Sequence, residues 1–243
     1  MLKIEGVIEW LGCMAQPSSM VLCFKSCDGN KTRYDWSAMM FGLEFFYAMA
    51  LYGTFFILWK GKQFLQRRKT GRDPEVMGDS SDALQRYFFL TTKVLSIFAT
   101  ALIFAHGAGL KDVWGFRRLA ELDIFPWDHI GFAIGAFGLS ICLLAQWTMG
   151  SSWRVGIDQR QTSALVTTGI FNFVRNPTYL GLFLLNGGLW LIWPTPTMAL
   201  FGLVFAYFLE VQVRCEEQYL TDLHGEMYKD YMVRTKRYFP LVY

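Results

Sequence analysis

Charged residues are scarce in this sequence. Asp, Glu, Lys and Arg make up 18% of the 243 residues, whereas hydrophobic residues make up 53% and aromatic residues 17%. Because charged residues reach roughly a quarter of an ordinary soluble domain, the composition argues against that class. The apolar blocks are spread along the chain rather than gathered in one part. We therefore predict a single polytopic membrane domain over residues 1–243.

Features that indicate several other classes of protein are also missing. The net charge is only +3, and no run of Lys or Arg with interleaved aromatics suggests a nucleic-acid partner. The five cysteines form no CxxC pair, so we predict neither a zinc site nor any other metal centre. Residues 1–20 lack the basic start and the uninterrupted apolar stretch of a secretory signal peptide.

The cysteines differ in their surroundings. Cys142 lies in an apolar run and is expected in the core. Cys13, Cys23 and Cys27 share the N-terminal segment, where two of them would form a disulfide if that segment faces an oxidising compartment.

Five apolar segments are predicted to be membrane helices. Three reach the roughly 20 residues needed for one crossing, and two shorter ones form a hairpin around the proline-rich turn 194–197. The predicted spans are Ser37–Trp59, Tyr87–Leu110, His129–Met149, Thr178–Trp193 and Met198–Val213. The chain thus divides into an extracytoplasmic segment (1–36), three membrane helices (37–149) and a region with the hairpin and a C-terminal helix (150–243). The fold class is all-α, with a polar loop over residues 60–86 and a tail that is helical to about Val233.

Basic residues set the predicted orientation. Residues 60–86, 150–177 and the tail from Gln212 carry 15 Lys and Arg, whereas residues 1–36 and 111–128 carry 7. Since the basic side of a membrane protein stays in the cytoplasm, the N-terminus is predicted outside and the C-terminus inside. Together with the missing signal peptide, this favours a bacterial inner membrane.

Two charged residues fall inside the predicted spans. Glu44 and Lys93 lie in helices that enter the membrane from opposite sides, which places them on the order of 10 Å apart in depth. We therefore do not expect them to form a salt bridge. Lys93 is expected to extend its amine towards the surface, and Glu44 to have a hydrogen-bonded structural role.

The residues before the hairpin resemble a small anion site. Gly169 permits a turn that other residues resist, and Asn176-Pro177 starts a helix. Free backbone amides at that helix start, with Arg175 beside them, would attract a carboxylate or a phosphate. The plainer alternative is an arginine at the membrane interface that contacts lipid phosphate.

A polar stripe is predicted where the last span leaves the membrane. Glu210, Arg214, Glu217, Thr221 and His224 recur at helical spacing and fall on one face, whereas Glu216 points about 100° away from Glu217. Carboxylates here would hold a cationic ligand group. The alternative is a solvated helix face on which Glu210 pairs with Arg214.

These segments together resemble the isoprenylcysteine carboxyl methyltransferases and related phospholipid methyltransferases. Members carry L-V-T-x-G, R-H-P-x-Y-x-G, E-E-x-x-L, G-x-x-Y-x-x-Y and a basic-aromatic-proline ending. The matching residues here are Leu165–Gly169, Arg175–Gly181, Glu216–Leu220, Gly225 with Tyr228 and Tyr231, and Arg237–Pro240. The ordered set covers roughly the last 90 residues. Asn176 replaces the family histidine; because Asn does not titrate, its position suits cofactor binding better than general-base work.

The resemblance implies a membrane methyltransferase that uses S-adenosyl-L-methionine and makes residues 150–243 its catalytic region. Glu216 or Glu217 suits the amino group or ribose of the cofactor, and Arg175 with the amides near Asn176 suits its carboxylate. Tyr179 and the backbone of Leu165, Val166 and Gly169 would enclose the adenosine, with Gly181 completing the motif. Arg237, Glu217 and Tyr231 are the implied catalytic residues, with Arg237 orienting an anionic acceptor and Tyr231 lining the pocket.

The acceptor itself is left open by the sequence. A lipophilic or small molecule with a carboxylate, a thiol or an amine fits, and a lipid tail would enter between the spans from the surrounding membrane lipids. An amine requires a base, whereas a carboxylate or a thiolate does not, and His224 is the only histidine near the predicted site. The sequence does not define an oligomeric state.

Two other functions remain possible at this stage. Cys215 and the ending Phe239–Tyr243 are similar to those of sterol reductases, which use NADPH. A non-enzymatic membrane scaffold is the second alternative, although the polar residues cluster outside the bilayer rather than along a transmembrane path. Binding of S-adenosylhomocysteine or NADPH distinguishes all three, because a scaffold would respond to neither.

Overall fold

The computed structural model describes residues 42–71, 73–78, 82–110, 113–120, 127–156 and 165–238. Within these ranges the chain is helical, and its only β pairing consists of the isolated bridges Glu75–Val155 and Val174–Lys236. The helices are α2 (Leu43–Thr70), α3 (Ala83–Gly107), α4 (Trp127–Met149), α5 (Pro177–Ile192), α6 (Pro196–His224) and α7 (Glu226–Arg234). Three 3-10 turns join them: η1 (Trp114–Phe116), η3 (Gly150–Ser152) and η4 (Gly169–Asn172). The predictions for residues 1–36, including a disulfide of Cys13, Cys23 or Cys27, lie outside the described residues.

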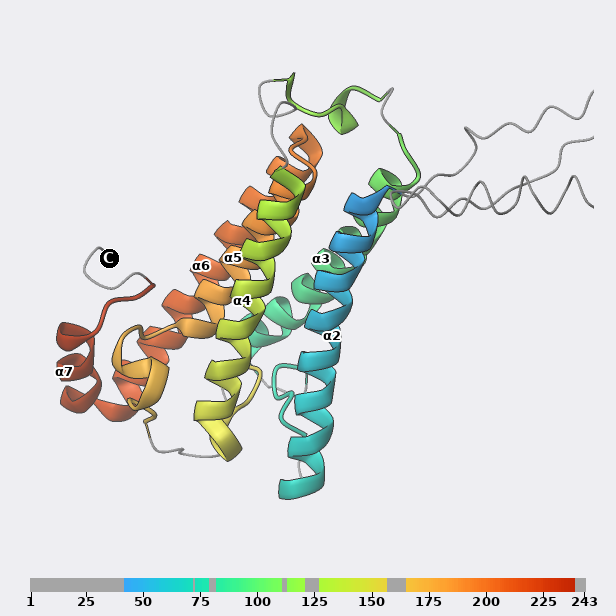
Figure 1. The fold of residues 1–243 in the computed structure, drawn as a ribbon. Coiled ribbons are helices and arrows are strands. Elements are labelled where there is room, and N and C mark those ends of the chain that lie inside the picture. Colours follow the sequence, from blue (N-terminus) through green and yellow to red (C-terminus); the bar gives the residue numbers. More distant parts are fainter. Residues whose placement is uncertain are drawn as a thin grey trace, which may run out of the picture.

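The helices α2 to α6 form an elongated bundle, and the short helix α7 lies to one side of its end (Figure 1). By length and composition α3, α4 with η3, and α6 are suited to cross a membrane, while α5 is a shorter apolar helix of 16 residues. Many large apolar side chains along the bundle are exposed, including Ile97, Leu203 and Tyr207. A belt of this kind fits a lipid environment, and the predicted all-α polytopic membrane fold is confirmed.

One predicted boundary is wrong. The expected loop over residues 60–86 is helical up to Thr70, because α2 continues past Trp59 without a residue that stops it. Lys, Gln, Leu and Arg in this stretch are good helix formers. The helix ends only at Gly71, which adopts the left-handed φ of 69° and donates its N–H to the Arg67 carbonyl.

The predicted hairpin is present between α5 and α6. Ile192 ends one helix and Pro196 begins the next, and the Thr195 hydroxyl caps α6 by accepting the Met198 N–H. The tail beyond Val213 is helical, as expected, but it bends at Gly225, whose φ is 56°. The bend directs α7 back towards the start of α5.

Glycines hold α4 and α5 in close contact. A Cβ on Gly138 would lie 2.5 Å from the Gly181 carbonyl, and one on Gly188 would lie 2.5 Å from the Gly131 carbonyl. Such approach of two backbones is typical of membrane helices with small residues at the interface. It fixes the end of α4 beside the start of α5, where the predicted motif residues lie.

The charged residues of the spans have separate partners. Glu44 accepts from Arg118 Nη1 at 3.3 Å, and Lys93 lies 4.8 Å from the centre of the Phe89 ring. Two polar side chains of α2 also hold the C-terminal end of α4 and the residues that follow it. Lys62 donates to the Gln146 and Gly150 carbonyls, and Gln66 to those of Ser151 and Trp153.

Candidate functional site

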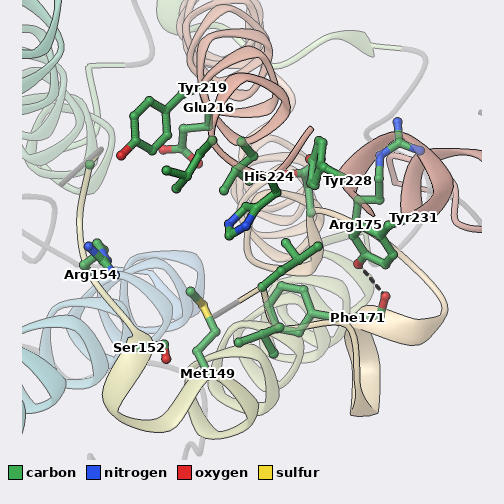
Figure 2. A pocket seen from close by; sticks show the side chains of 16 residues that line it. Met149, Ser152, Arg154, Phe171, Arg175, Glu216, Tyr219, His224, Tyr228 and Tyr231 are labelled. Atoms are coloured by element: carbon green, nitrogen blue, oxygen red, sulfur yellow. Dashed lines mark hydrogen bonds between the residues drawn. The ribbon is translucent and has the colours of Figure 1, made fainter. Parts of the chain in front are cut away.

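A cleft opens at the end of the bundle where α4 ends, α5 begins and α6 continues towards α7 (Figure 2). Its empty space, which includes open solvent at the mouth, is about 880 Å³. Its lining comes from five parts of the chain: Met149, Ser152, Arg154 and Gly156; Leu165, Val166 and Phe171; Arg175 and Asn176; Glu216, Tyr219, Leu220, Leu223 and His224; and Tyr228 and Tyr231.

The two predicted motif regions meet at this cleft through the backbone. Val174 and Lys236 form a parallel bridge, and Arg175 N–H donates to the Lys236 carbonyl at 2.8 Å. Asn176 N–H then donates to the Arg237 carbonyl at 3.2 Å. The C-terminal segment is therefore fixed along the residues that lead into α5.

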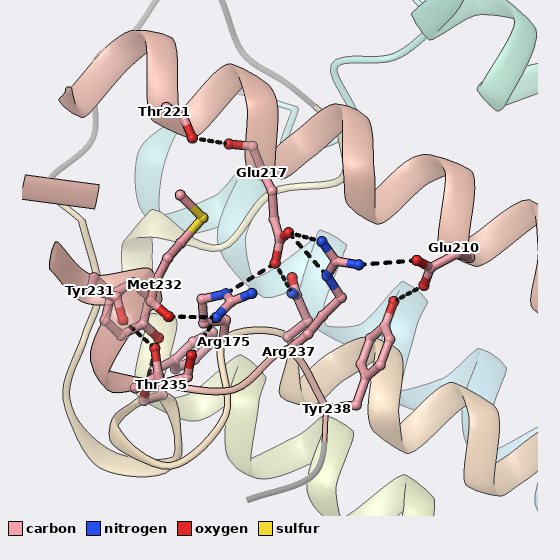
Figure 3. Close-up of polar contacts among 11 residues, drawn as sticks. Arg175, Glu210, Glu217, Thr221, Tyr231, Met232, Thr235, Arg237 and Tyr238 are labelled. Carbon is pink, nitrogen blue, oxygen red and sulfur yellow. Dashed lines mark hydrogen bonds and ion pairs between the residues drawn. The ribbon is translucent and has the colours of Figure 1, made fainter. Parts of the chain in front are cut away.

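Glu217 is the centre of an ion-pair network behind the cleft (Figure 3). Its Oε1 accepts Arg175 Nε at 3.1 Å and Asn176 Nδ2 at 2.8 Å. Its Oε2 accepts Arg237 Nε at 3.0 Å and Nη2 at 2.7 Å. A carboxylate offers about four acceptor positions, so these bonds occupy the whole group. Only 8% of the Glu217 side chain is exposed.

The network extends along α6. Arg237 Nη1 also donates to Glu210 at 3.1 Å, and Tyr238 Oη donates to the other Glu210 oxygen at 2.6 Å. Arg214 completes it, since its Nε donates to Glu210 at 2.8 Å, which confirms the expected pairing of these two side chains. Arg175 Nη1 contacts the carbonyls of Met232 and Thr235. These hydrogen bonds therefore fix the orientation of each arginine side chain in the network.

Glu216 has a different environment from its neighbour. One oxygen, Oε1, accepts Tyr179 Oη at 2.6 Å and Gln212 Nε2 at 3.4 Å. Within the described chain, Oε2 accepts no hydrogen bond, and Glu216 lines the cleft. A half-buried carboxylate with an available oxygen is suited to a cationic or hydroxyl group of a ligand.

Two tyrosines of α7 form the outer wall. Tyr231 Oη donates to the Phe171 carbonyl at 2.6 Å, which links α7 to η4. Burial raises the pKa of Tyr231 to about 12, and burial also raises the pKa of Tyr228 above its usual range. Both phenols therefore stay protonated at neutral pH, and Tyr231 acts as a hydrogen-bond donor.

The cleft contains part of the residue set predicted from the sequence. Leu165, Val166, Arg175, Asn176, Glu216 and Tyr231 line it. Five other predicted residues, Gly169, Tyr179, Gly181, Glu217 and Arg237, are not among the lining residues. Gly169 forms the turn into η4 with a φ of 60°, Tyr179 supports Glu216, and Gly181 contacts α4.

Several lining residues were not predicted. Met149, Ser152, Arg154 and Gly156 come from the end of α4 and the segment after it. Tyr219, Leu220 and Leu223 share the face of α6 that carries Glu216, since they follow it at spacings of three, four and seven residues. The helical spacing of these three residues from Glu216 identifies this face of α6. The prediction relied instead on the neighbouring charged face, which carries Glu217.

Comparison with known proteins finds similarity to several methyltransferases. Residues 127–227 match the family model described as phospholipid methyltransferase. Protein-S-isoprenylcysteine O-methyltransferase of Dictyostelium discoideum is 31% identical over 122 residues, which are 46% of this chain and 48% of that one. The B enzyme of that name from Arabidopsis thaliana is 28% identical over 59% of this chain and 78% of its own. Methanethiol S-methyltransferase of Crocosphaera subtropica is 26% identical over 63% and 60%. The match thus spans about half the length of the Dictyostelium relative.

A solved structure shares the fold. The eukaryotic intramembrane Ras methyltransferase, isoprenylcysteine carboxyl methyltransferase, superposes with a TM-score of 0.50 at 18% identity, over 81% of this chain and 68% of that one. The family model covers the part of the chain that holds α4, the hairpin and the Glu216–Glu217 pair. The predicted resemblance is confirmed: over residues 127–227 the chain is similar to the phospholipid methyltransferase family, and isoprenylcysteine O-methyltransferases are among the proteins it resembles.

Proposed function

We propose that the protein is an integral membrane methyltransferase that uses S-adenosyl-L-methionine and methylates a lipophilic or small acceptor at the cytoplasmic membrane surface. The proposal rests on one observation, which is that side chains of opposite charge line the same cleft. Arg175 lines it with a fixed guanidinium, and Glu216 lines it with an available oxygen. A zwitterionic amino-acid group is complementary to such a pair.

The residues of the cleft fit this cofactor. Glu216 Oε2 is suited to its amino group or ribose hydroxyls, and Arg175 with Asn176 to its carboxylate. Leu165, Val166 and Phe171 offer an apolar wall for the adenosine. When bound, the cofactor supplies a methyl group on a sulfonium, which is already a strong electrophile. The protein therefore has mainly to position the two reactants.

We assign Glu217 and Arg237 positioning roles in this scheme. Glu217 holds Arg175 and Asn176, so it acts on the cofactor site through them. Arg237 spans Glu217 and Glu210 and fixes the C-terminal segment. Tyr231 lines the cleft and anchors α7. Gly169, Tyr179 and Gly181 support the site from the turn and from α5.

The names of two relatives indicate the classes of acceptor to consider. One is named for isoprenylcysteine and another for methanethiol, so both a lipophilic and a small acceptor are consistent with this fold. We propose a membrane orientation with residues 1–36 outside and the cleft in the cytoplasm. The excess of basic residues on the cleft side supports it, and a bacterial inner membrane fits the same orientation.

Calorimetry on detergent-purified protein tests the proposal. We expect S-adenosylhomocysteine to bind with micromolar affinity and NADPH not to bind. Glu216→Gln should weaken that affinity at least 10-fold and leave the thermal midpoint within a few degrees, because the replacement keeps the shape but not the charge. Binding of NADPH alone would move the chain to the reductase class, and binding of neither ligand would support a scaffold.

A second substitution separates the two adjacent carboxylates. Glu217→Gln leaves Arg175 without its counter-charge, and Arg237 with Glu210 alone, in a buried network, which costs on the order of 3–5 kcal/mol of stability. We expect its thermal midpoint and its cofactor affinity to fall together. If Glu217→Gln lost affinity with unchanged stability, Glu217 would be a direct ligand rather than a positioning residue.

A further inference from the structure

The cleft holds one imidazole that the cofactor roles leave unused. His224 occupies the last position of α6 and lines the cleft, half-buried. Its ring projects among the other lining side chains (Figure 2). It makes no hydrogen bond or ion pair with any described residue, so it does not serve as a capping partner for the last carbonyls of its helix.

Apart from the Glu216 carboxylate, the titratable groups that line the cleft with His224 are poor proton acceptors near neutral pH. Arginine stays protonated in proteins. The α7 tyrosines have raised pKa values, and Glu216 is assigned to the cofactor. Histidine is the side chain that most often acts as a general base in enzymes. The facing groups are Arg154 after η3, Arg175 before α5, Glu216 and Tyr219 on α6, and Tyr228 and Tyr231 on α7.

The spacing along α6 suits a proton acceptor. Eight residues separate Glu216 from His224, which is about 12 Å along the helix axis. They lie about 80° apart around it, so both face the same cleft. A reacting atom must approach the methyl carbon to about 3–3.5 Å, and a base must lie within about 3 Å of the proton it takes. Along the helix, Glu216 and His224 are thus far enough apart to contact different parts of one bound ligand.

Building on the proposed function, we propose that His224 is the proton acceptor of the site and that the methyl acceptor is a thiol or amine, not a carboxylate. The acceptor sulfur or nitrogen forms a bond to the methyl carbon while the bond from that carbon to the sulfonium breaks. The electron pair of the broken bond stays on the departing sulfur, which becomes a neutral thioether. The proton of the acceptor passes to a ring nitrogen of His224 and from there to water. A carboxylate acceptor carries no such proton, so its methylation would not require a base.

The test compares three acceptors with a labelled methyl donor: ethanethiol, dioleoylphosphatidylethanolamine and N-acetyl-S-farnesylcysteine. We expect transfer to the thiol or to the amine, with a kcat that rises with pH. His224→Gln should lower kcat about 100-fold or more and remove that rise, as expected for loss of a general base. Its affinity for S-adenosylhomocysteine should stay within about 2-fold of the unchanged protein.

A matched control and a second readout make the test specific. His129→Gln changes an exposed histidine at the other end of α4 and should leave kcat unchanged. Diethyl pyrocarbonate modifies accessible imidazoles, and the sequence contains only three histidines. S-adenosylhomocysteine together with the best acceptor should protect one site, and this protection should be absent in His224→Gln.

Three outcomes would overturn the inference. These are an unchanged pH profile and kcat in His224→Gln, transfer only to the farnesylcysteine carboxylate, or a parallel loss of S-adenosylhomocysteine affinity, which would make His224 a cofactor ligand. Failure of the wild-type protein to bind S-adenosylhomocysteine would instead overturn the proposed function on which the inference rests.

Discussion

Adjacent carboxylates on α6 have different tasks because a helix turns about 100° per residue. Glu217 faces Arg175, Asn176 and Arg237, which use both of its oxygens. Glu216 faces the cleft and keeps one oxygen available among the described contacts. The two carboxylates therefore differ in environment, and under the proposed function Glu216 is the ligand-binding group and Glu217 the structural one.

The hydroxyl of Tyr179 offers a test of this division. Tyr179→Phe removes the 2.6 Å hydrogen bond to Glu216 without removing the ring. A hydrogen bond to a charged group contributes about 1.5–3 kcal/mol. Part of that is lost from positioning Glu216, so we expect S-adenosylhomocysteine to bind about 10-fold more weakly by calorimetry.

Tyr238→Phe is the matched control for that measurement. Its hydroxyl makes an equally short bond to Glu210, outside the cleft lining. We expect a lower thermal midpoint and nearly unchanged affinity. Equal losses of affinity in both variants would show that Glu216 has no special place in the cofactor site.

At the scale of helices, the α4–α5 contact is the most sensitive to added volume. A Cβ on Gly188 would lie 2.5 Å from the Gly131 carbonyl and 2.7 Å from the Gly135 nitrogen. Gly188→Ala therefore forces the helices apart. Overpacking of this kind costs about 1–3 kcal/mol, and we expect a clear drop in thermal midpoint in detergent.

The neighbouring glycine provides the control. A Cβ on Gly187 would meet no atom within 4 Å, although it lies in the same helix. Because alanine has a higher helix propensity than glycine by about 1 kcal/mol, Gly187→Ala should be neutral or slightly stabilising. A similar drop in both variants would show that the close approach of Gly188 to α4 does not decide the result.

The sequence predicted the helices better than it predicted their ends and faces. Apolar length located each described span and the hairpin, and the ordered motifs predicted that Arg175 and the Glu216–Glu217 pair would meet. The basic stretch after Trp59 suggested a loop because charge was taken as a sign of exposure, whereas its residues favour helix until Gly71. The division between Glu216 and Glu217 depends on which segments contact α6, and residues far apart in sequence decide that.

At the scale of the whole molecule, the orientation of the protein in the membrane decides on which side of the bilayer the cleft lies. Trp114 lies near the hairpin end and Val233 on α7 at the cleft end, and both are highly exposed, at 83% and 82%. In a background without native cysteines, Trp114→Cys should react with an impermeant maleimide in intact cells. Val233→Cys should react only after lysis. The reverse pattern would place the cleft outside the cell and contradict the basic-residue rule.

The pairing of Val174 with Lys236 has a consequence for how the protein is made. The helices that cross the membrane all precede Gly225 and enter the bilayer as they leave the ribosome. One wall of the cleft and one partner of Glu217 come from residues that follow Gly225. A polypeptide interrupted at Gly225 would still be a membrane-inserted bundle, but it would have no binding site. The cleft is therefore complete only once the segment after Gly225 has been synthesised, later than the membrane helices that precede it.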